Sequence, residues 1–366
     1  ENPYLRLEGQ SLLMTYSTVE ALFPAPLVAS WVERDLFPLL RSGDVRLESF
    51  LLDGKVQQFK KLELPENQGA LAMGFDCRNF TVQGSRLREP LKDVSAKVTL
   101  KDGVLLVSEL KGVSGKSQIQ EGLLKVRDIF HPHPVFEPWV RGSFDLKDVL
   151  HQCEADFLSH QFKEVIENTE SVSGTIEGQA RFKYETSMES PEITQADLLF
   201  RDCALKQKHW PFSLALKEGL LRIGEENGTP SRARAHGQRP WPESRGRFEG
   251  SGSWGASSFA AEGAFLMKGL SVEPRWMEVV ADLDSSQVWS LISPGWSPAE
   301  FKGPALCRGS LRKDKDRWSV KGTADIGSVT VDHELFLMDP PGKGDRVTFE
   351  FDLVPRKHIR FKQVFF

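Results

Sequence analysis

Fourteen consecutive residues, 172–185, alternate without interruption between small or apolar side chains and polar ones. The apolar side of this stretch carries Val172, Gly174, Ile176, Gly178, Ala180, Phe182 and Tyr184. Successive side chains of a β-strand point to opposite faces, so the pattern predicts one strand with an apolar face and a wet face. At about 3.3 Å per residue this strand spans roughly 45 Å, whereas globular strands usually have about 5–6 residues. The pattern therefore favours the wall of an extended sheet over the middle of a compact sandwich.

Composition limits the class of protein. The 366 residues are enough for two or three ordinary domains or one long repetitive domain. With 47 Lys and Arg against 51 Asp and Glu, the chain has no basic excess, and we expect no nucleic-acid partner. No stretch reaches the roughly 18 apolar residues of a membrane-spanning helix. Because the chain starts at Glu1 without Met and ends in strand-like residues, we expect it to be a fragment of a longer protein.

The four cysteines are widely spaced and form no C-x-x-C pair, which disfavours a zinc site. They are Cys77, Cys153, Cys203 and Cys307. Isolated buried thiols are the favoured interpretation. A disulfide stays open as an alternative, because connectivity cannot be read from a sequence.

Two stretches carry helical rather than strand spacing. Apolar residues between Leu27 and Leu40 recur at helical intervals and predict an amphipathic helix closed by Gly43. The polar side of that helix includes both acidic and basic residues, which favours packing across the end of a sheet over contact with a membrane. A second stretch, 145–167, predicts one or two short helices. Residues 225–246 are rich in Arg, Gly and Pro and predict a solvated loop.

Strands are expected in most of the remaining chain. The strand pattern starts at Val45, Leu47 and Leu51, and 94–100 continues it. Lys101-Asp102-Gly103, directly after 94–100, is typical of a tight hairpin turn.

Faint internal repetition indicates an array of similar pieces. Residues 100–105 are echoed by 216–221, and 144–150 are echoed more weakly by 283–289. Residues 172–174, which follow 144–150, are matched by 301–303, which follow 283–289. The shared order predicts a recurring unit of a short helix, a glycine-bearing strand and a hairpin.

This order of pieces resembles the AsmA-like envelope proteins of the YhdP type, with TamB as a more distant relative. The resemblance is carried by residues 16–43 leading into 44–47, by 94–98 with 102–105 and 111–117, and by 142–146 before the second helical stretch with Gly174 after it. It implies a mainly β fold: an elongated, curved antiparallel β-sheet groove of repeating units, with short amphipathic helices between the repeats.

The repeats are expected in four segments. They are 1–43, a helical lead-in from a preceding repeat; 44–140, a β-groove repeat; 141–265, a helix plus β-groove repeat with the Arg-rich loop; and 266–366, a helix plus a partial β-groove repeat.

The resemblance also implies a function and a location. Proteins of this family move phospholipid between the inner and outer membranes across the periplasm of Gram-negative bacteria. They have no catalytic residues, so we expect no enzyme activity, cofactor or metal. The expected partners are phospholipid acyl chains, together with the inner membrane through an N-terminal anchor that this chain lacks.

Motifs of other chemistries are incomplete. Residues 250–255 match G-x-G-x-x-G, but the alternation that follows favours a glycine-rich strand over a dinucleotide-binding turn. Residues 115–117 imitate the end of a P-loop, but Leu110 occupies the position of its first glycine. In 131–134 each His precedes a Pro, which favours a rigid connector over a metal site. No G-x-S-x-G elbow supports a hydrolase.

The leading hypothesis is a lipid conduit whose apolar face shields acyl chains from water. The residues predicted to line it are Val172, Ile176, Ala180, Phe182, Val94, Val98, Phe349 and Phe351. Gly174, Gly178 and Ala180 are expected to permit curvature and to leave room for a chain. The alternative is a non-catalytic envelope scaffold or outer-membrane assembly factor, in which the same faces close into a filled β core.

Overall fold

The computed structural model describes most of the chain in two compact units. The described ranges are 2–18, 32–83, 89–152, 166–185, 191–208, 212–224, 244–268, 271–287, 299–314, 317–333, 336–338, 345–354 and 358–365. The first unit comprises Glu1–Ile166 and Thr175–Ala196, and the second comprises Glu167–Gly174 and Asp197–Phe366. Both are mainly β and are built on open antiparallel sheet, with only a few short helices among the described residues.

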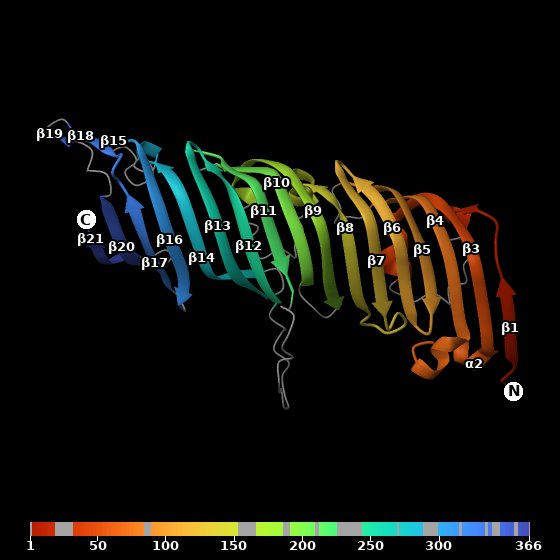
Figure 1. Ribbon diagram of the computed structural model, residues 1–366. Helices are drawn as coiled ribbons and strands as arrows, with labels where there is room; N and C mark the ends of the chain where they lie inside the picture. Colours follow the sequence, from red (N-terminus) through yellow and green to blue (C-terminus); the bar gives the residue numbers. More distant parts are fainter. Residues whose placement is uncertain are drawn as a thin grey trace, which may run out of the picture. The chain divides into compact units, whose positions relative to one another are not determined.

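The first unit is a run of neighbouring antiparallel strands (Figure 1). Its strands are β1 (Tyr4–Gly9), β2 (Met14–Thr15), β3 (Leu40–Lys55), β4 (Leu71–Val82), β5 (Leu91–Lys101), β6 (Val104–Ser114), β7 (Ser117–Arg127) and β8 (Val135–Asp145). The short helices are η2 (Val32–Leu36), η3 (Phe37–Leu39), α2 (Val56–Phe59), η4 (Pro65–Ala70) and α3 (Leu146–Gln152). Each strand from β3 to β8 pairs with the next, while β1 and β2 both pair with β3. Two further strands, β9 (Thr169–Glu185) and β10 (Glu192–Gln207), contribute residues to both units.

The second unit repeats this plan. Its strands are β11 (Leu214–Ile223), β12 (Ser244–Trp254), β13 (Ser257–Lys268), β14 (Ser271–Asp284), β16 (Pro304–Asp314), β17 (Arg317–Asp325), β20 (Arg346–Val354) and β21 (His358–Phe365). They pair in that order from β11 to β21. A separate three-stranded sheet is formed by β15 (Ala299–Lys302), β18 (Thr330–His333) and β19 (Phe336–Met338).

The predicted long strand at 172–185 is confirmed as part of β9, which has 17 residues. The hairpin predicted at 101–103 is also confirmed. Asp102 and Gly103 both have positive φ, of 51° and 71°, as a two-residue turn between β5 and β6 requires. The G-x-G-x-x-G stretch belongs to the end of β12 and its turn into β13, so the strand interpretation is confirmed there too.

Other predictions need correction. The helix expected to end at Gly43 is replaced over its described part by the short turns η2 and η3, and Gly43 lies inside β3. Residues 19–31 lie outside the described residues. Pro38 at the start of η3 favours a tight turn, and Leu40 already pairs with Val82.

The second predicted helix is confirmed only as α3, since 153–165 also lie outside the described residues. So do residues 225–243 of the Arg-rich loop, while Ser244–Gly246 belong to β12.

The echo between 100–105 and 216–221 is wrong. The first segment makes a turn, but the second lies within β11. The echo between 144–150 and 283–289 has a matching geometry, because Asp148 and Gln287 accept equivalent hydrogen bonds from Ser117 and Ser257.

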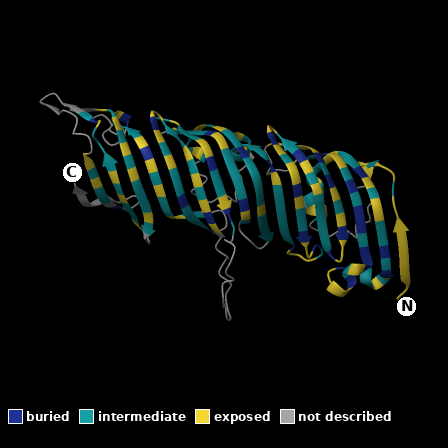
Figure 2. Ribbon diagram, in the orientation of Figure 1, coloured by how far each residue is buried: buried dark blue, intermediate teal, exposed yellow. Residues whose placement is uncertain are grey.

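The polar and apolar sides of these strands separate because directly paired residues share a face of the sheet. Figure 2 shows the resulting alternation of exposed and more buried residues along most strands. In β3 a bulge between Leu47 and Ser49 shifts the pairing, so that Phe50 and Leu52 continue the apolar face. Leu51, which the sequence pattern placed on that face, therefore lies on the other one.

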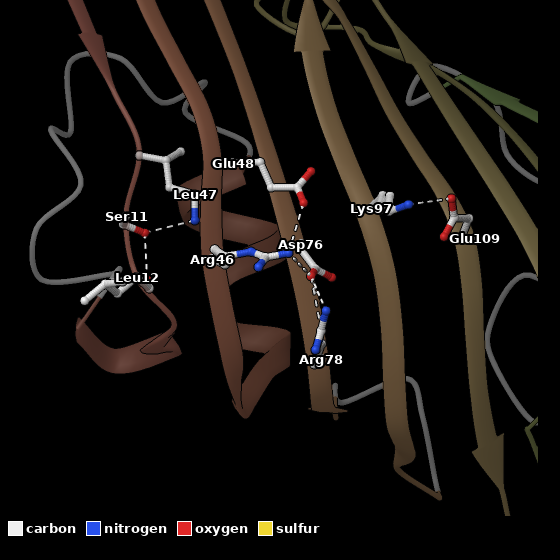
Figure 3. Close-up of polar contacts among 9 residues, drawn as sticks. All are labelled: Ser11, Leu12, Arg46, Leu47, Glu48, Asp76, Arg78, Lys97 and Glu109. Carbon is white, nitrogen blue, oxygen red and sulfur yellow. Dashed lines mark hydrogen bonds and ion pairs between the residues drawn. The ribbon is translucent and has the colours of Figure 1, made fainter.

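The opposite side of the first unit, here called its ionic face, carries ion pairs within strands and between neighbouring strands (Figure 3). Asp76 on β4 accepts from Arg46 at 3.0 Å and from Arg78 at 2.7 Å. Lys97 on β5 reaches Glu109 on β6 at 2.8 Å. These contacts keep charge on one face and leave the other to apolar side chains.

Candidate apolar binding surface

One row of residues runs across the strands on the apolar face of the first unit, and we call it the central row. It consists of Leu47, Phe75, Val98, Val107, Leu124, Pro138 and Phe182. The position of Phe182 opposite Pro138 follows from the flanking pairs Phe136–Tyr184 and Val140–Ala180. From β5 to β9 the row crosses four strand spacings, about 19 Å in total.

Every side chain of the central row is half-buried. Apolar side chains in the core of a domain are usually buried completely, so the side chains of this row are covered only in part. The row therefore presents a band of apolar surface that the described chain covers only in part.

Two buried clusters cover the same face on either side of the central row over β3 to β5. One contains Leu52, Leu62, Leu71, Met73, Leu100 and Ile129. The other contains Tyr16, Val45, Phe80 and Val94. Phe75 packs against both clusters. In this part of the unit the apolar face is thus largely covered by the chain itself.

The second unit has an apolar face of similar construction. One row consists of Gly219, Gly250, Ala261, Val279, Gly309, Gly322 and Phe349. Aromatic rings lie over some of these glycines: a Cβ built on Gly322 would be 2.5 Å from Phe349 Cζ, and one on Gly250 would be 2.8 Å from Phe248 Cζ. At these two positions the glycines make room for rings of the protein itself.

The predicted lining residues fall into three groups. Val98 and Phe182 share the central row, while Ile176 and Ala180 lie on the same face of β9, opposite Phe144 and Val140. Ile176 is 9% exposed and the other three are half-buried.

Val94 belongs to the buried cluster with Tyr16 and is 8% exposed. Val172, Phe349 and Phe351 belong to the second unit. Val172 and Phe349 are half-buried; Phe351 is opposite Val320 in backbone register, and its side chain lies outside the described residues.

Gly174 has a different role from the one expected. It adopts φ 117°, and an added Cβ would be 2.4 Å from Cys203 Cα. The position therefore allows the backbone of β10 to approach closely, which leaves no space there for a ligand chain.

Val107 and Leu124 of the central row were not among the residues predicted to line the surface. A signal for the first existed, because a two-residue turn at Asp102-Gly103 pairs Val98 with Val107 directly. The position of Leu124 depends on the pairing of β6 with β7 and had no comparable local signal.

Two depressions of the second unit include residues of the sheet face opposite to its glycine row. One, of about 740 Å³, includes Ser251, Ala260 and Val280, which are successive partners on that face. Another, of about 490 Å³, includes the ion pair between Lys321 and Glu350 at 3.0 Å. Neither depression is a deep apolar pocket of the kind that encloses a small molecule.

The structure describes three cysteine thiols. Among the described residues, Cys77, Cys203 and Cys307 form no disulfide. Burial, and then the nearby Asp76 charge, raise the pKa of the Cys77 thiol to about 11. Within the described ranges, no cluster of three or more His, Cys, Asp or Glu could hold a metal ion. No described helix is long and apolar enough to cross a bilayer.

Comparison of the chain with protein-family models, with characterised proteins and with solved structures finds no match.

Proposed function

We propose that this chain is a segment of an AsmA-like, YhdP-type envelope protein that conducts phospholipids between the inner and outer membranes. In this proposal the sheet curves into a groove of successive repeats, and short helices separate the repeats. The chain lies in the periplasm of a Gram-negative bacterium, and a segment outside it anchors the intact protein to the inner membrane.

The observation that carries the proposal is the half-buried central row. It brings seven apolar side chains from successive strands into one band, while the ion pairs of these strands lie on the other face. An acyl chain against this band would lose contact with water without meeting a charge.

The energetics suit transfer rather than tight capture. Moving a methylene out of water is worth about 0.8 kcal/mol, but a bilayer already provides the same benefit. A surface of similar apolar character thus binds an acyl chain at little net cost or gain relative to the membrane. Near-equivalent positions along such a row would let the chain slide, and the headgroup would stay in water.

The proposal is tested by Val107→Asp, which places a charge in the central row. The matched control is Ser108→Asp, because the neighbouring residue in β6 pairs with Lys97 on the ionic face. Lipids that co-purify with the full chain are counted by mass spectrometry after extraction. We expect Val107→Asp to lose most of its lipid, since a charge in contact with hydrocarbon is strongly unfavourable.

Ser108→Asp should keep the lipid load of the unmodified chain. Equal lipid loads in a folded Val107→Asp variant and in the control would contradict the proposal. Circular dichroism establishes that both variants retain their strand content.

A non-catalytic envelope scaffold or assembly factor is the second candidate. The two buried clusters over β3 to β5 favour it, because a covered face packs as a core and binds nothing. Absence of lipid from the unmodified full chain, together with retention of an envelope partner protein, would select this function.

A further inference from the structure

The side chain of Tyr16 covers one edge of the apolar face where β3, β4 and β5 lie side by side. It is 8% exposed and packs with Val45, Phe80 and Val94. Its ring lies edge-on to those of Phe37 and Phe80, with centroid distances of 6.3 and 5.8 Å. The Tyr16 hydroxyl donates to the carbonyl oxygen of Phe37 at 3.2 Å.

The segment that carries Tyr16 has a short attachment to the sheet. Strand β2 pairs with β3 through only two residues, Met14 and Thr15. Before it, Ser11 exchanges two hydrogen bonds with the backbone of Leu47: its amide donates to the Leu47 carbonyl at 2.9 Å, and its hydroxyl accepts from the Leu47 amide at 3.0 Å (Figure 3). We call residues 11–18 the strap.

The residues between these two attachments do not pack on the sheet. Leu12 is 86% exposed and Leu13 is 54% exposed, although both are large and apolar. The strap thus leaves two leucines in solvent while it inserts one aromatic ring into the apolar face. Tyr16 is consequently the main apolar contact that the strap makes with the buried cluster.

The other rim of the same strands is covered independently. Leu62 and Ile129 are each 4% exposed and lie with Leu71 and Leu100 in the buried cluster that does not contain Tyr16. Val107 and Leu124, farther along the central row, are only half-buried and belong to neither cluster. Along the central row, the residues beyond β5 thus belong to neither cluster, whereas Val126, two residues from Leu124 on the same face of β7, is 0% exposed.

We propose that the strap, through Tyr16, is a plug that ends the lipid-binding surface at β5. On this inference, which rests on the proposed function, acyl chains occupy the face from Val107 onward through β7, β8 and β9. Tyr16 holds the space over Phe80 and Val94 that a chain would otherwise enter. Val94 then contacts the plug, whereas Val98 lies at the edge of the lipid-binding surface.

The plug is tested by photolabelling the full chain with phosphatidylethanolamine vesicles whose acyl chains carry a diazirine. Labelled peptides are mapped by mass spectrometry. In the unmodified chain we expect label at Val107 and Leu124, and less than about a tenth as much at Phe80 and Val94, because close packing excludes the chain there. Tyr16→Ala should raise label at Phe80 and Val94 by about fivefold or more, since loss of the ring leaves a cavity.

Two matched variants separate the ring from other effects. Tyr16→Phe keeps the ring and should keep the unmodified labelling pattern. Tyr4→Ala removes a tyrosine of β1 that is 66% exposed and should also change nothing. If Tyr16→Ala unfolds the first unit by circular dichroism, Tyr16→Val serves in its place and should give an intermediate rise.

The outcomes distinguish the plug from the proposed function. Equal label at Val94 and Val107 in the unmodified chain would overturn the plug and leave the lipid surface standing. An unchanged pattern in a folded Tyr16→Ala or Tyr16→Val variant would also overturn it. No label at any position of the apolar face would remove the proposed function, and the plug with it.

Discussion

Asp76 and Cys77 are adjacent residues of β4 that face opposite sides of the sheet. Asp76 is 8% exposed and accepts charged hydrogen bonds from two arginines. The Arg78 guanidinium, more than any other group, holds the pKa of this carboxyl below its usual value. Cys77 pairs with Val45 and Ala96 on the apolar face, where burial raises its pKa. One strand therefore stabilises a charge on one side and suppresses ionisation on the other.

Asp76→Asn should lower the free energy of unfolding by about 1–3 kcal/mol at pH 7, as expected for loss of charged hydrogen bonds at a buried site. The folded pKa lies below the unfolded value of about 3.9, so this stabilisation is present above that value. It is lost as the pH falls through the folded pKa. Urea unfolding at several pH values measures the difference between the two proteins. A difference that stays constant down to pH 2 would contradict this assignment.

Cys77 should react slowly with iodoacetamide at pH 8, because a thiol with a pKa of about 11 is almost entirely protonated there. The rate at this residue, followed by peptide mass spectrometry, should keep rising up to about that pKa in folded protein. A plateau near pH 9 would show an ordinary thiol. Asp76→Asn provides a check, because the main cause of the shift is burial and most of it should remain.

At the scale of elements, tight turns determine which residues of neighbouring strands meet. Asp102 and Gly103 both adopt positive φ between β5 and β6. This turn brings Val98 opposite Val107, and a slip by one residue would move Val107 to the ionic face. A Cβ on Gly103 would also lie 2.0 Å from Gln68 Oε1, so the turn fits closely against the region of η4.

Gly103→Val should destabilise the first unit by about 1–3 kcal/mol, because a β-branched residue is strained at positive φ. The matched control is Gly309→Ala in β16, where the nearest contact of an added Cβ is 3.4 Å and φ is not positive. That variant should be neutral or slightly more stable. Chemical unfolding of both variants measures the effect. An equal loss in the two would show that the turn conformation is not the cause.

At the scale of the whole molecule, one hydrogen-bonded arrangement occurs twice. In the first unit Asp148 Oδ2 accepts from the Lys116 amide at 2.6 Å and from the Ser117 hydroxyl at 3.1 Å. The Ser117 hydroxyl accepts in turn from the amide of Asp145 at 3.0 Å. Each arrangement joins a hairpin turn to the start of a helical turn. We call it the turn–helix clasp.

The second clasp has the same geometry, with a glutamine in place of the aspartate as the side-chain acceptor. Gln287 Oε1 accepts from the Ala256 amide at 2.9 Å and from the Ser257 hydroxyl at 3.3 Å. That hydroxyl accepts from the Asp284 amide at 3.0 Å. Gly115 and Gly255 occupy equivalent turn positions, with φ 57° and 59°. The repeated geometry supports the weak echo between 144–150 and 283–289.

Ser117→Ala should destabilise the first unit, and Ser257→Ala the second, by about 1–3 kcal/mol each, because each leaves a backbone amide without its acceptor. Hydrogen exchange followed by mass spectrometry should show faster exchange in β6 to β8 for the first variant. Faster exchange in β12 to β14 is expected for the second. Equal effects of either variant on both regions would contradict a local role for the clasps.

The parts of the fold that were predictable depend on local patterns. The alternation of 172–185 and the Asp102-Gly103 turn were both sufficient, because strand faces and tight turns are set within a few residues. The bulge after Leu47 was not predictable, since it depends on pairing with β4. The helix expected near Gly43 failed for a similar reason: Leu40 had a pairing partner in Val82, and long-range pairing outweighed helical spacing.

The features of the candidate site also divide into those set by local sequence and those set by tertiary packing. The sequence by itself determined that the strands have an apolar and an ionic face, because alternation follows from backbone geometry. Only the tertiary structure decided how far the apolar face is covered. Tyr16 and Ile129 reach it from distant parts of the chain, and they cover β3 to β5 while Val107 and Leu124 stay half-buried. Burial depends on such non-local packing, which no pattern of neighbouring residues specifies.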